Sequence, residues 1–171
     1  MSDRFFVNGP IPLGEFSLGG EEAHHLANVR RMVEGDPVVL FNGDGNRYPG
    51  TVLSVAKRSV LLHVSSVERS RSELSVPCWI ASALPKGDRF DFLLEKLTEL
   101  GVTDFVPLVT ERSVVIPKAE KRDKWRRAVI EASKQCGRDV LMRIHPPTGF
   151  GELIRWGDLP RRKWIAHPSG E

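Results

Sequence analysis

The sequence has few of the features that mark disulfide-rich, zinc-binding or membrane proteins. Its two cysteines, Cys78 and Cys136, lie far apart, without CxxC spacing, and no HExxH motif occurs, so neither a disulfide framework nor a metal site is expected. No apolar run approaches the roughly 20 residues that cross a bilayer. The opening residues, Met1–Arg4, are polar and no apolar signal core follows them. We therefore expect a cytoplasmic protein with no metal and no membrane contact.

Motifs for nucleotide binding and for nucleophilic catalysis are also missing. There is no GxGxxG after a strand and no P-loop, so neither a Rossmann site nor an NTPase is supported. Neither cysteine has a convincing His or Asp partner in the sequence. His24 and His25 are adjacent, and adjacent residues diverge on a helix. A hydrolase therefore has no supporting motif.

Positive charge is concentrated in the second half of the chain. The net charge is +3, and residues 1–72 are neutral, with 8 basic and 8 acidic side chains. Between Arg112 and Arg138 the count is 9 basic to 3 acidic. Clustered positive charge is typical of a phosphate-binding face. A solvated basic helix accounts for the same pattern, so composition leaves both interpretations open.

The first part of the chain predicts short strands with tight turns. Strands are expected at 4–7, 37–41, 48–55 and 59–67, with a hairpin turn at 42–45 where Asn and Gly accept positive φ cheaply. A helix is expected from Gly20, with an apolar face of Leu26, Val29 and Met32. Closely spaced short strands joined by tight turns are typical of a small β-barrel. The polar, aperiodic residues 68–75 then predict a boundary between domains 1–70 and 76–171.

The second part alternates strand and helix patterns. Strands are expected at 76–83, 105–109 and 163–166. A first helix begins after Asp88 as N-cap, shows Phe92, Leu93, Leu97 and Leu100 at helical spacing, and ends at Gly101. A second covers 121–136, with Trp125, Val129, Ala132 and Cys136 along one side. This order predicts an α/β layer with a largely parallel sheet.

Ligands of such sheets gather beyond the carboxyl ends of the strands. The loops expected there, 84–89, 110–113 and 167–170, mix charge, hydroxyl groups and glycine. On the second helix, Arg127, Glu131 and Arg138 stand at i, i+4 and i+11, offsets that share one helix face. Two interpretations of that face are open. Either it carries only an exposed ion pair, which would stabilise the helix by about 0.3–0.5 kcal/mol, or its arginines bind RNA phosphates.

Several segments together resemble the RsmE family of ribosomal RNA uridine N3-methyltransferases. The methyltransferase blocks are matched by residues 83–89 with 95–102, by 107–108 with 110–113, and by 131–132 with 135–138. The N-terminal half matches at 4–7, 24–26, 29–31, 35–36 and 41–43 with Tyr48. The resemblance covers nearly all 171 residues in the family's order.

The resemblance implies an N-terminal PUA-like barrel followed by a SPOUT-type α/β domain with a C-terminal knot. It implies transfer of a methyl group from S-adenosylmethionine to N3 of one uridine in bacterial 16S ribosomal RNA, by a homodimer. On the matched blocks we expect Arg138 to stabilise the anion of the base and Glu131 to orient it or accept its proton. The positions expected to bind the cofactor are Thr110, Glu111, His167 and Pro168, and those expected to bind RNA are Arg4, Arg30, Arg31, Arg47, Lys86, Arg89, Arg112 and Arg127.

The family also builds its cofactor pocket from a segment resembling Ile-Gly-Pro-Glu-Gly-Gly and a later Leu-Arg-x-Glu-Thr segment. The 171 residues contain neither of them, nor the knot-forming tail. The alternative function is therefore that of an RNA-binding PUA-like module with an incomplete, inactive methyltransferase half. Binding of S-adenosylmethionine would discriminate between the two.

Overall fold

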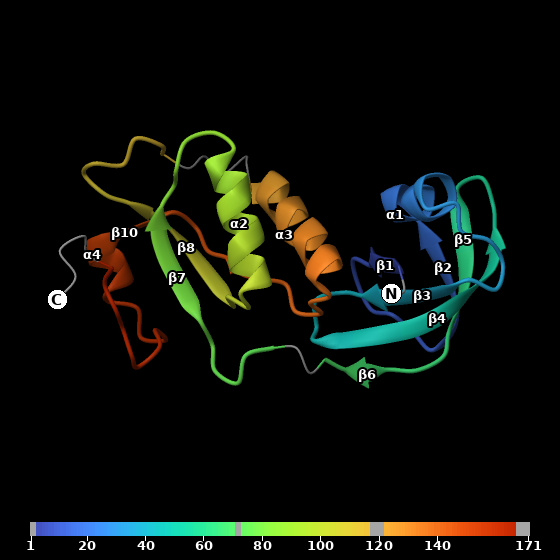
Figure 1. Ribbon diagram of the computed structural model, residues 1–171. Helices are drawn as coiled ribbons and strands as arrows, with labels where there is room; N and C mark the ends of the chain where they lie inside the picture. The colour runs from blue at the N-terminus through green and yellow to red at the C-terminus, as the bar shows by residue number, and fades with distance from the viewer. Residues whose placement is uncertain (1–2, 71–72, 117–121, 167–171) are drawn as a thin grey trace.

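The protein folds around two β-sheets that lie at opposite ends of an elongated molecule (Figure 1). A computed structural model describes residues 3–70, 73–116 and 122–166. The first sheet belongs to the N-terminal part of the chain and the second to the α/β part, with helix α3 (Arg122–Cys136) between them (Figure 1).

The N-terminal sheet has six strands in the order β1-β3-β4-β5-β2, with β6 paired to β4. The strands are β1 (Asp3–Phe6), β2 (Gly14–Gly19), β3 (Pro37–Phe41), β4 (Asn46–Val55), β5 (Ser59–Val64) and β6 (Glu68–Arg69). The pairing of β1 with β3 is parallel and the other pairings are antiparallel. Phe5, Leu40, Val60 and Leu62 are fully buried in its core. The expected strands are confirmed, whereas closure into a barrel stays a prediction.

The turn between β3 and β4 forms as its sequence predicts. Gly43 and Gly45 both have positive φ, which a side chain would make costly. The side chains of Asn42 and Asp44 accept hydrogen bonds from backbone N–H groups two residues further on. These local hydrogen bonds replace backbone pairing within the turn.

The expected helix after Gly20 is present but changes its winding. Helix α1 (Gly20–His24) continues into a π-helical turn, η1 (His25–Val29). Leu26 and Met32 are buried as expected, but Val29 is exposed. A π-helical turn is wider than an α-helical turn, so a spacing of three residues no longer returns to the same face.

The α/β part has a four-stranded, wholly parallel sheet. Its strands are β7 (Trp79–Ala83), β8 (Asp104–Val109), β9 (Arg143–Ile144) and β10 (Thr148–Gly149), in the order β10-β8-β7 with β9 also on β8. Helices α2 (Arg89–Glu99) and α3 cover one face of this sheet (Figure 1), and the short α4 (Phe150–Leu153) follows β10. A parallel sheet with crossover helices is confirmed, whereas the knot stays a prediction.

Helix α2 buries only part of the expected face, since Leu97 is buried and Leu93 packs against the core as expected. Phe90, Leu94 and Leu97 are buried, whereas Phe92 and Leu100 are exposed. The spacing of four and then three residues selects the buried set, because i, i+4 and i+7 share a face. Asp88 stands at the N-cap position but makes no side-chain capping hydrogen bond.

Helix α3 buries Trp125, Val129 and Ala132 against the sheet and α2, as expected. Cys136, at its last position, is exposed. Gly137 follows with positive φ, the usual way for a helix to end, and the chain turns away there.

The expected strand at 163–166 is wrong. These residues form no strand, and Trp164 and Ile165 are 90% and 81% exposed. The outer edge of β8 is occupied by β9 and β10, two strands too short for sequence periodicity to indicate. Residues 163–166 therefore have no β8 edge on which to pair.

Across the described ranges, no helix combines the length and the apolarity that a membrane span requires.

Candidate functional site

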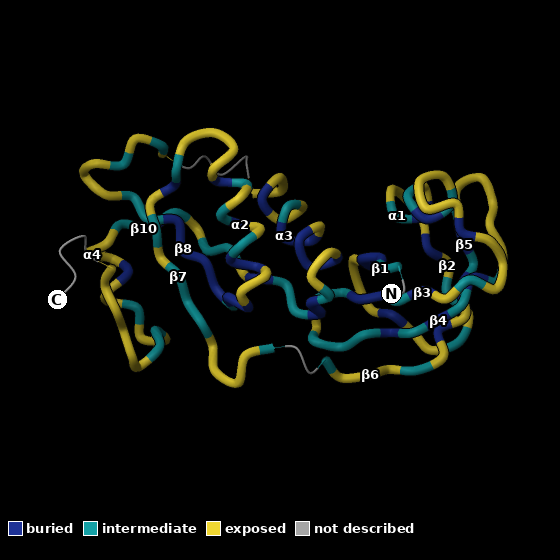
Figure 2. The backbone as a smooth tube through the Cα atoms, viewed as in Figure 1, coloured by how far each residue is buried: buried dark blue, intermediate teal, exposed yellow. Residues whose placement is uncertain are grey.

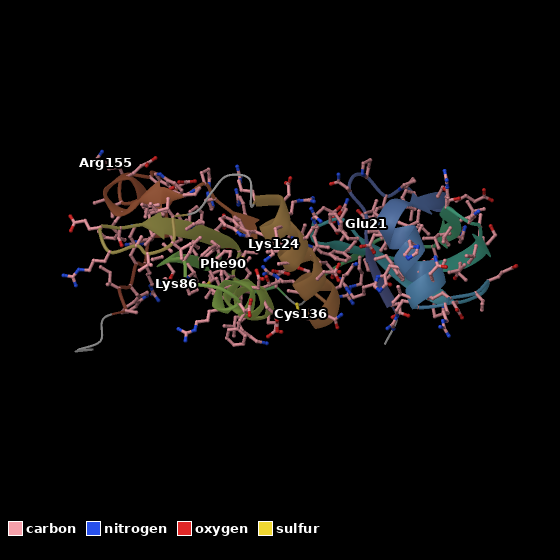
Figure 3. All side chains as sticks on the ribbon, turned by 90° about the horizontal axis from the view of Figure 1, so that it is seen from above. Glu21, Lys86, Phe90, Lys124, Cys136 and Arg155 are labelled. Carbon is pink, nitrogen blue, oxygen red and sulfur yellow. The ribbon has the colours of Figure 1, made fainter. Side chains whose placement is uncertain are left out.

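The carboxyl ends of β7 and β8 meet at one edge of the sheet, because the two strands run parallel. The loop after β7 carries Lys86 and leads to Arg89 at the start of α2, and the loop after β8 carries Glu111 and Arg112. All four residues are exposed, and Figure 2 shows exposed stretches in both loops. In Figure 3 the side chain of Lys86 lies on the outer side of the α/β domain, away from the N-terminal sheet. Two of the three polar loops expected from the sequence thus lie together. The third begins with His167 and Pro168, which lie outside the described residues.

The loop after β8 is held by its own hydroxyl groups. The backbone N–H of Thr110 donates to Oγ of Ser113 at 2.8 Å, and the two hydroxyl oxygens lie 3.1 Å apart. These contacts fix the turn that presents Glu111 and Arg112 to solvent.

A hollow of about 230 Å³ adjoins the same edge. Its apolar wall includes Leu84, Phe90, Val115, Ile116 and Trp125, and Asp88, Asp91 and Lys124 supply charge. Binding sites for small molecules combine an apolar lining with a few polar groups. The hollow therefore has the mixed lining of a small-molecule site, and the loop with Thr110 and Glu111 follows the neighbouring strand β8.

Arg138 does not lie where the helical offset placed it. Helix α3 ends at Cys136, and Arg138 is 4% exposed. Its Nε and Nη2 donate to the carboxylate of Glu73 at 2.9–3.0 Å, and its Nη1 donates to the carbonyl oxygens of Thr98 and Val102 at 3.2 and 2.7 Å. The second N–H of Nη2 donates to the carbonyl oxygen of Gly101 at 3.4 Å.

An arginine has five N–H donors, and these contacts engage all of them. Arg138 therefore holds the interdomain segment at Glu73 against the end of α2 and has no donor left for a substrate anion. The expected placement of Arg138 on one helix face with Arg127 and Glu131 is wrong. The physical reason is the αL residue Gly137, which ends the helix, so the i+11 offset no longer applies.

Glu131 lies on α3 but faces the N-terminal domain. Its carboxylate accepts a hydrogen bond from Nζ of Lys134 at 2.9 Å, and the same Nζ reaches Glu22 at 2.5 Å. Burial lowers the pKa of Lys134, but the hydrogen bonds to Glu22 and Glu131 outweigh it and hold that pKa above its ordinary value. Glu131 thus takes part in a charged contact between the domains.

Two of the arginines expected to bind RNA face a carboxylate that the sequence analysis missed. Asp139 is fully buried. Arg4 donates from Nη2 to its Oδ1 at 2.5 Å, and Arg47 donates from Nε and Nη2 to its Oδ2 at 3.2 and 3.1 Å. Arg4 also donates to the carbonyl oxygen of Arg138 at 3.0 Å. These arginines join the N-terminal domain to the segment after α3. In the sequence, the only sign that Asp139 is buried is its position directly before the apolar Val140.

The other cationic residues expected to bind RNA are exposed: Arg30, Arg31, Lys86, Arg89, Arg112 and Arg127. Arg30 pairs with Asp3 on the surface, and Arg31 has the positive φ of 54° that is unusual outside glycine. Among the described residues, no group of three His, Cys, Asp or Glu side chains could hold a metal ion.

Comparison with protein families gives two matches. Residues 18–65 match the RNA methyltransferase PUA domain and residues 72–171 the RNA methyltransferase domain. The ribosomal RNA small subunit methyltransferase E of Bacillus subtilis is 38% identical over 144 residues, 82% of this chain and 56% of the relative. The Synechocystis protein of the same name is 34% identical over 138 residues, 81% of this chain and 45% of the relative. The chain thus spans about half the length of these relatives.

Solved structures agree with the sequence matches. A methyltransferase from Legionella pneumophila, in complex with S-adenosylmethionine, superposes with a TM-score of 0.88 at 30% identity over 99% of this chain and 72% of that one. The ribosomal RNA small subunit methyltransferase E of Neisseria gonorrhoeae, bound to S-adenosylmethionine, gives 0.84 at 27% identity over 94% and 67%. The chain therefore belongs to the RNA methyltransferase family that includes the ribosomal RNA small subunit methyltransferases E.

Proposed function

We propose that this protein takes part in S-adenosylmethionine-dependent methylation of N3 of a specific uridine in 16S ribosomal RNA. The observation that carries the proposal is the fit of 99% of the chain to a methyltransferase that binds S-adenosylmethionine. The cofactor would supply an electrophilic methyl group. The residues proposed for its side of the site are Thr110 and Glu111, with His167 and Pro168 kept from the sequence match.

The chemistry makes two demands on the protein. Uridine N3 must lose its proton before it can attack a methyl group, so a proton acceptor must lie within hydrogen-bond reach. Negative charge then develops on the base oxygens, and a nearby cation or N–H donor stabilises it. We assign the second task to Arg112, which is exposed in the loop after β8 beside Glu111.

RNA would reach this edge across exposed cations. We propose phosphate contacts for Arg30 and Arg31 in the N-terminal domain and for Lys86, Arg89 and Arg127 in the α/β domain, all of which are exposed. Binding that depends on such contacts weakens as salt rises, because counterions released from the RNA must return. An RNA affinity that stayed constant from low to high salt would contradict this assignment.

The activity is tested by incubating the chain with small ribosomal subunits and S-adenosylmethionine carrying an isotope-labelled methyl group. Mass spectrometry of the digested RNA should reveal labelled N3-methyluridine. Arg112→Ala should lower the rate by on the order of a hundredfold, the loss typical of removing one donor to a developing anion. Lys57→Ala, in the exposed turn between β4 and β5, is the matched control and should leave the rate unchanged.

The second candidate is an RNA-binding module with an inactive methyltransferase half. The comparisons do not favour it, because residues 72–171 match the RNA methyltransferase domain. Calorimetric titration with S-adenosylhomocysteine separates the two candidates. Saturable binding supports the enzyme, whereas RNA binding without cofactor binding supports the module.

A homodimer is also part of the proposal. Large apolar side chains are exposed on the α/β domain, among them Phe92, Leu100 and Trp164, and a second copy would remove them from water. Sedimentation equilibrium should therefore give twice the chain mass of 19.2 kDa. A mass of one chain at micromolar concentration would contradict it.

A further inference from the structure

A cavity of about 670 Å³ lies between the N-terminal half of α3 and the segment that leads into β9. Its lining residues are Arg122, Asp123, Arg126, Val129, Leu141, Met142, Arg143 and Ile144. We call this cavity the α3–β9 groove. None of its residues belongs to the set expected to bind RNA.

The groove has a basic rim and an apolar floor. The lining has three basic residues, Arg122, Arg126 and Arg143, and one acidic residue, Asp123, so the rim carries a net positive charge. Val129, Leu141, Met142 and Ile144 supply the apolar surface. Arginine forks bind phosphate oxygens bidentately, and an apolar floor between them suits the face of a sugar or an unstacked base.

Contacts with the N-terminal domain hold one wall of the groove in place. Arg126 donates to Oδ1 of Asn8 at 3.2 Å and lies over the ring of Phe6, 5.2 Å from its centroid. On the opposite wall, Leu141 packs against Gly43 so closely that a Cβ there would come within 2.9 Å of its Cγ. The groove is therefore built at the junction of the two domains.

The remaining rim cations point toward solvent. The side chain of Arg143 is 71% exposed although its Nε pairs with Asp104 at 2.9 Å, so much of its guanidinium is open to a ligand. Arg122 is exposed at the start of α3. Two exposed guanidinium groups therefore stand on opposite walls of the groove, with Arg126 held at the domain junction.

The geometry points to the α3–β9 groove as a binding site for the phosphodiester backbone of single-stranded RNA. This inference rests on the proposed function, and it identifies the part of the substrate that contacts the domain junction. Single-stranded RNA fits because its bases are free to turn onto apolar surfaces while the phosphates face the arginines. The bases of an A-form duplex are stacked, so their faces could not contact the apolar floor.

The test measures binding of the intact chain to a fluorescent single-stranded RNA copied from the small-subunit ribosomal RNA, by anisotropy at several salt concentrations. The double variant Arg122→Gln with Arg143→Gln should lower the affinity on the order of tenfold at low salt. It should also lower the slope of log affinity against log salt by about 1.4, because each phosphate contact to a single strand contributes about 0.7. Arg155→Gln is the matched control, since Arg155 is exposed at the far end of the α/β domain (Figure 3).

A second measurement does not depend on the variants. RNA that carries 4-thiouridine should form photo-crosslinks to the wild-type chain within residues 122–129 or 141–144, and mass spectrometry of the peptides locates them. Crosslinks confined to other segments, or wild-type affinity in the double variant, would overturn the groove while leaving the proposed function intact. If the wild-type chain binds no ribosomal RNA at all, the proposed function fails and the groove assignment fails with it.

Discussion

Asp139→Ala is expected to be among the most destabilising single changes at the domain junction. The carboxylate is fully buried and accepts hydrogen bonds from Arg4 and Arg47. Removing it leaves the guanidinium of Arg4, 10% exposed, without its ionic partner. Arg4 would retain the carbonyl of Arg138 and the ring of Phe41, 4.8 Å away, but its Nε already lacks a hydrogen bond.

The magnitude follows from the uncompensated charge. Removing one partner of a buried ion pair costs about 3–5 kcal/mol, against a total stability of about 5–15 kcal/mol for a typical domain. Arg47 adds little to that loss, because its side chain is 35% exposed and water can solvate it. Asp139→Asn keeps an oxygen that accepts from Arg4, so it should cost less, about 1–3 kcal/mol.

Urea unfolding measures this loss domain by domain. Trp79, Trp125, Trp156 and Trp164 all follow residue 72, so tryptophan fluorescence follows the α/β part, whereas far-ultraviolet circular dichroism follows both parts. Asp139→Ala should lower the unfolding midpoint and separate the two transitions. The control is Asp158→Ala, an exposed aspartate whose loss should stay within about 0.5 kcal/mol. A loss below about 1 kcal/mol for Asp139→Ala would refute the reasoning.

Two further changes test the N-terminal sheet. Tyr48 is the single tyrosine of the chain, and its hydroxyl donates to Asp44 at 2.6 Å. This hydrogen bond, with burial and the charge of Asp44, raises the pKa of Tyr48 above its ordinary value of 10.0. Ultraviolet titration of tyrosinate should show that pKa falling in Asp44→Asn, and an unchanged curve would contradict the assignment. Gly50→Ala should destabilise the protein by about 1–3 kcal/mol, because the new Cβ would lie 2.6 Å from the carbonyl oxygen of His63. Gly157→Ala meets no atom within 4 Å, so thermal unfolding should separate the two substitutions.

The elements that the sequence predicted correctly are those whose signals are local. The β3–β4 turn depends on Asn42 and Gly43, whose conformational preferences act within four residues. Gly101 ends α2 for the same kind of reason. The face of α2 was predicted only in part, because Phe92 and Leu94 are both apolar and only packing against the sheet decides which one is buried. The short strands β9 and β10 form by pairing with an edge of β8, and no local sequence pattern indicates that edge.

The candidate site was likewise predictable from the sequence only in part. The polar loops after β7 and β8 were predictable, since parallel strands end at one edge whatever their side chains contact. The partners of individual arginines were not, because Arg4 and Asp139 lie 135 positions apart in the chain. Only the packing of the two domains brings such residues together. Charge and the family match therefore indicated RNA-binding arginines without separating the exposed Arg112 from Arg4, which lies at the junction.

Arg138 shows why a matched motif does not by itself assign a role. An arginine that neutralises a substrate anion must keep at least one N–H directed at the ligand, whereas an arginine with a purely structural role can use all five within the protein. Arg138 is of the second kind, since Glu73 and three backbone carbonyl groups engage its whole guanidinium. Both kinds can stand in a family motif, because a position can be needed for structure as well as for chemistry. What separates them is the direction of their donors, so loss of activity in an Arg138 variant has to be measured beside loss of stability before it can be assigned to chemistry.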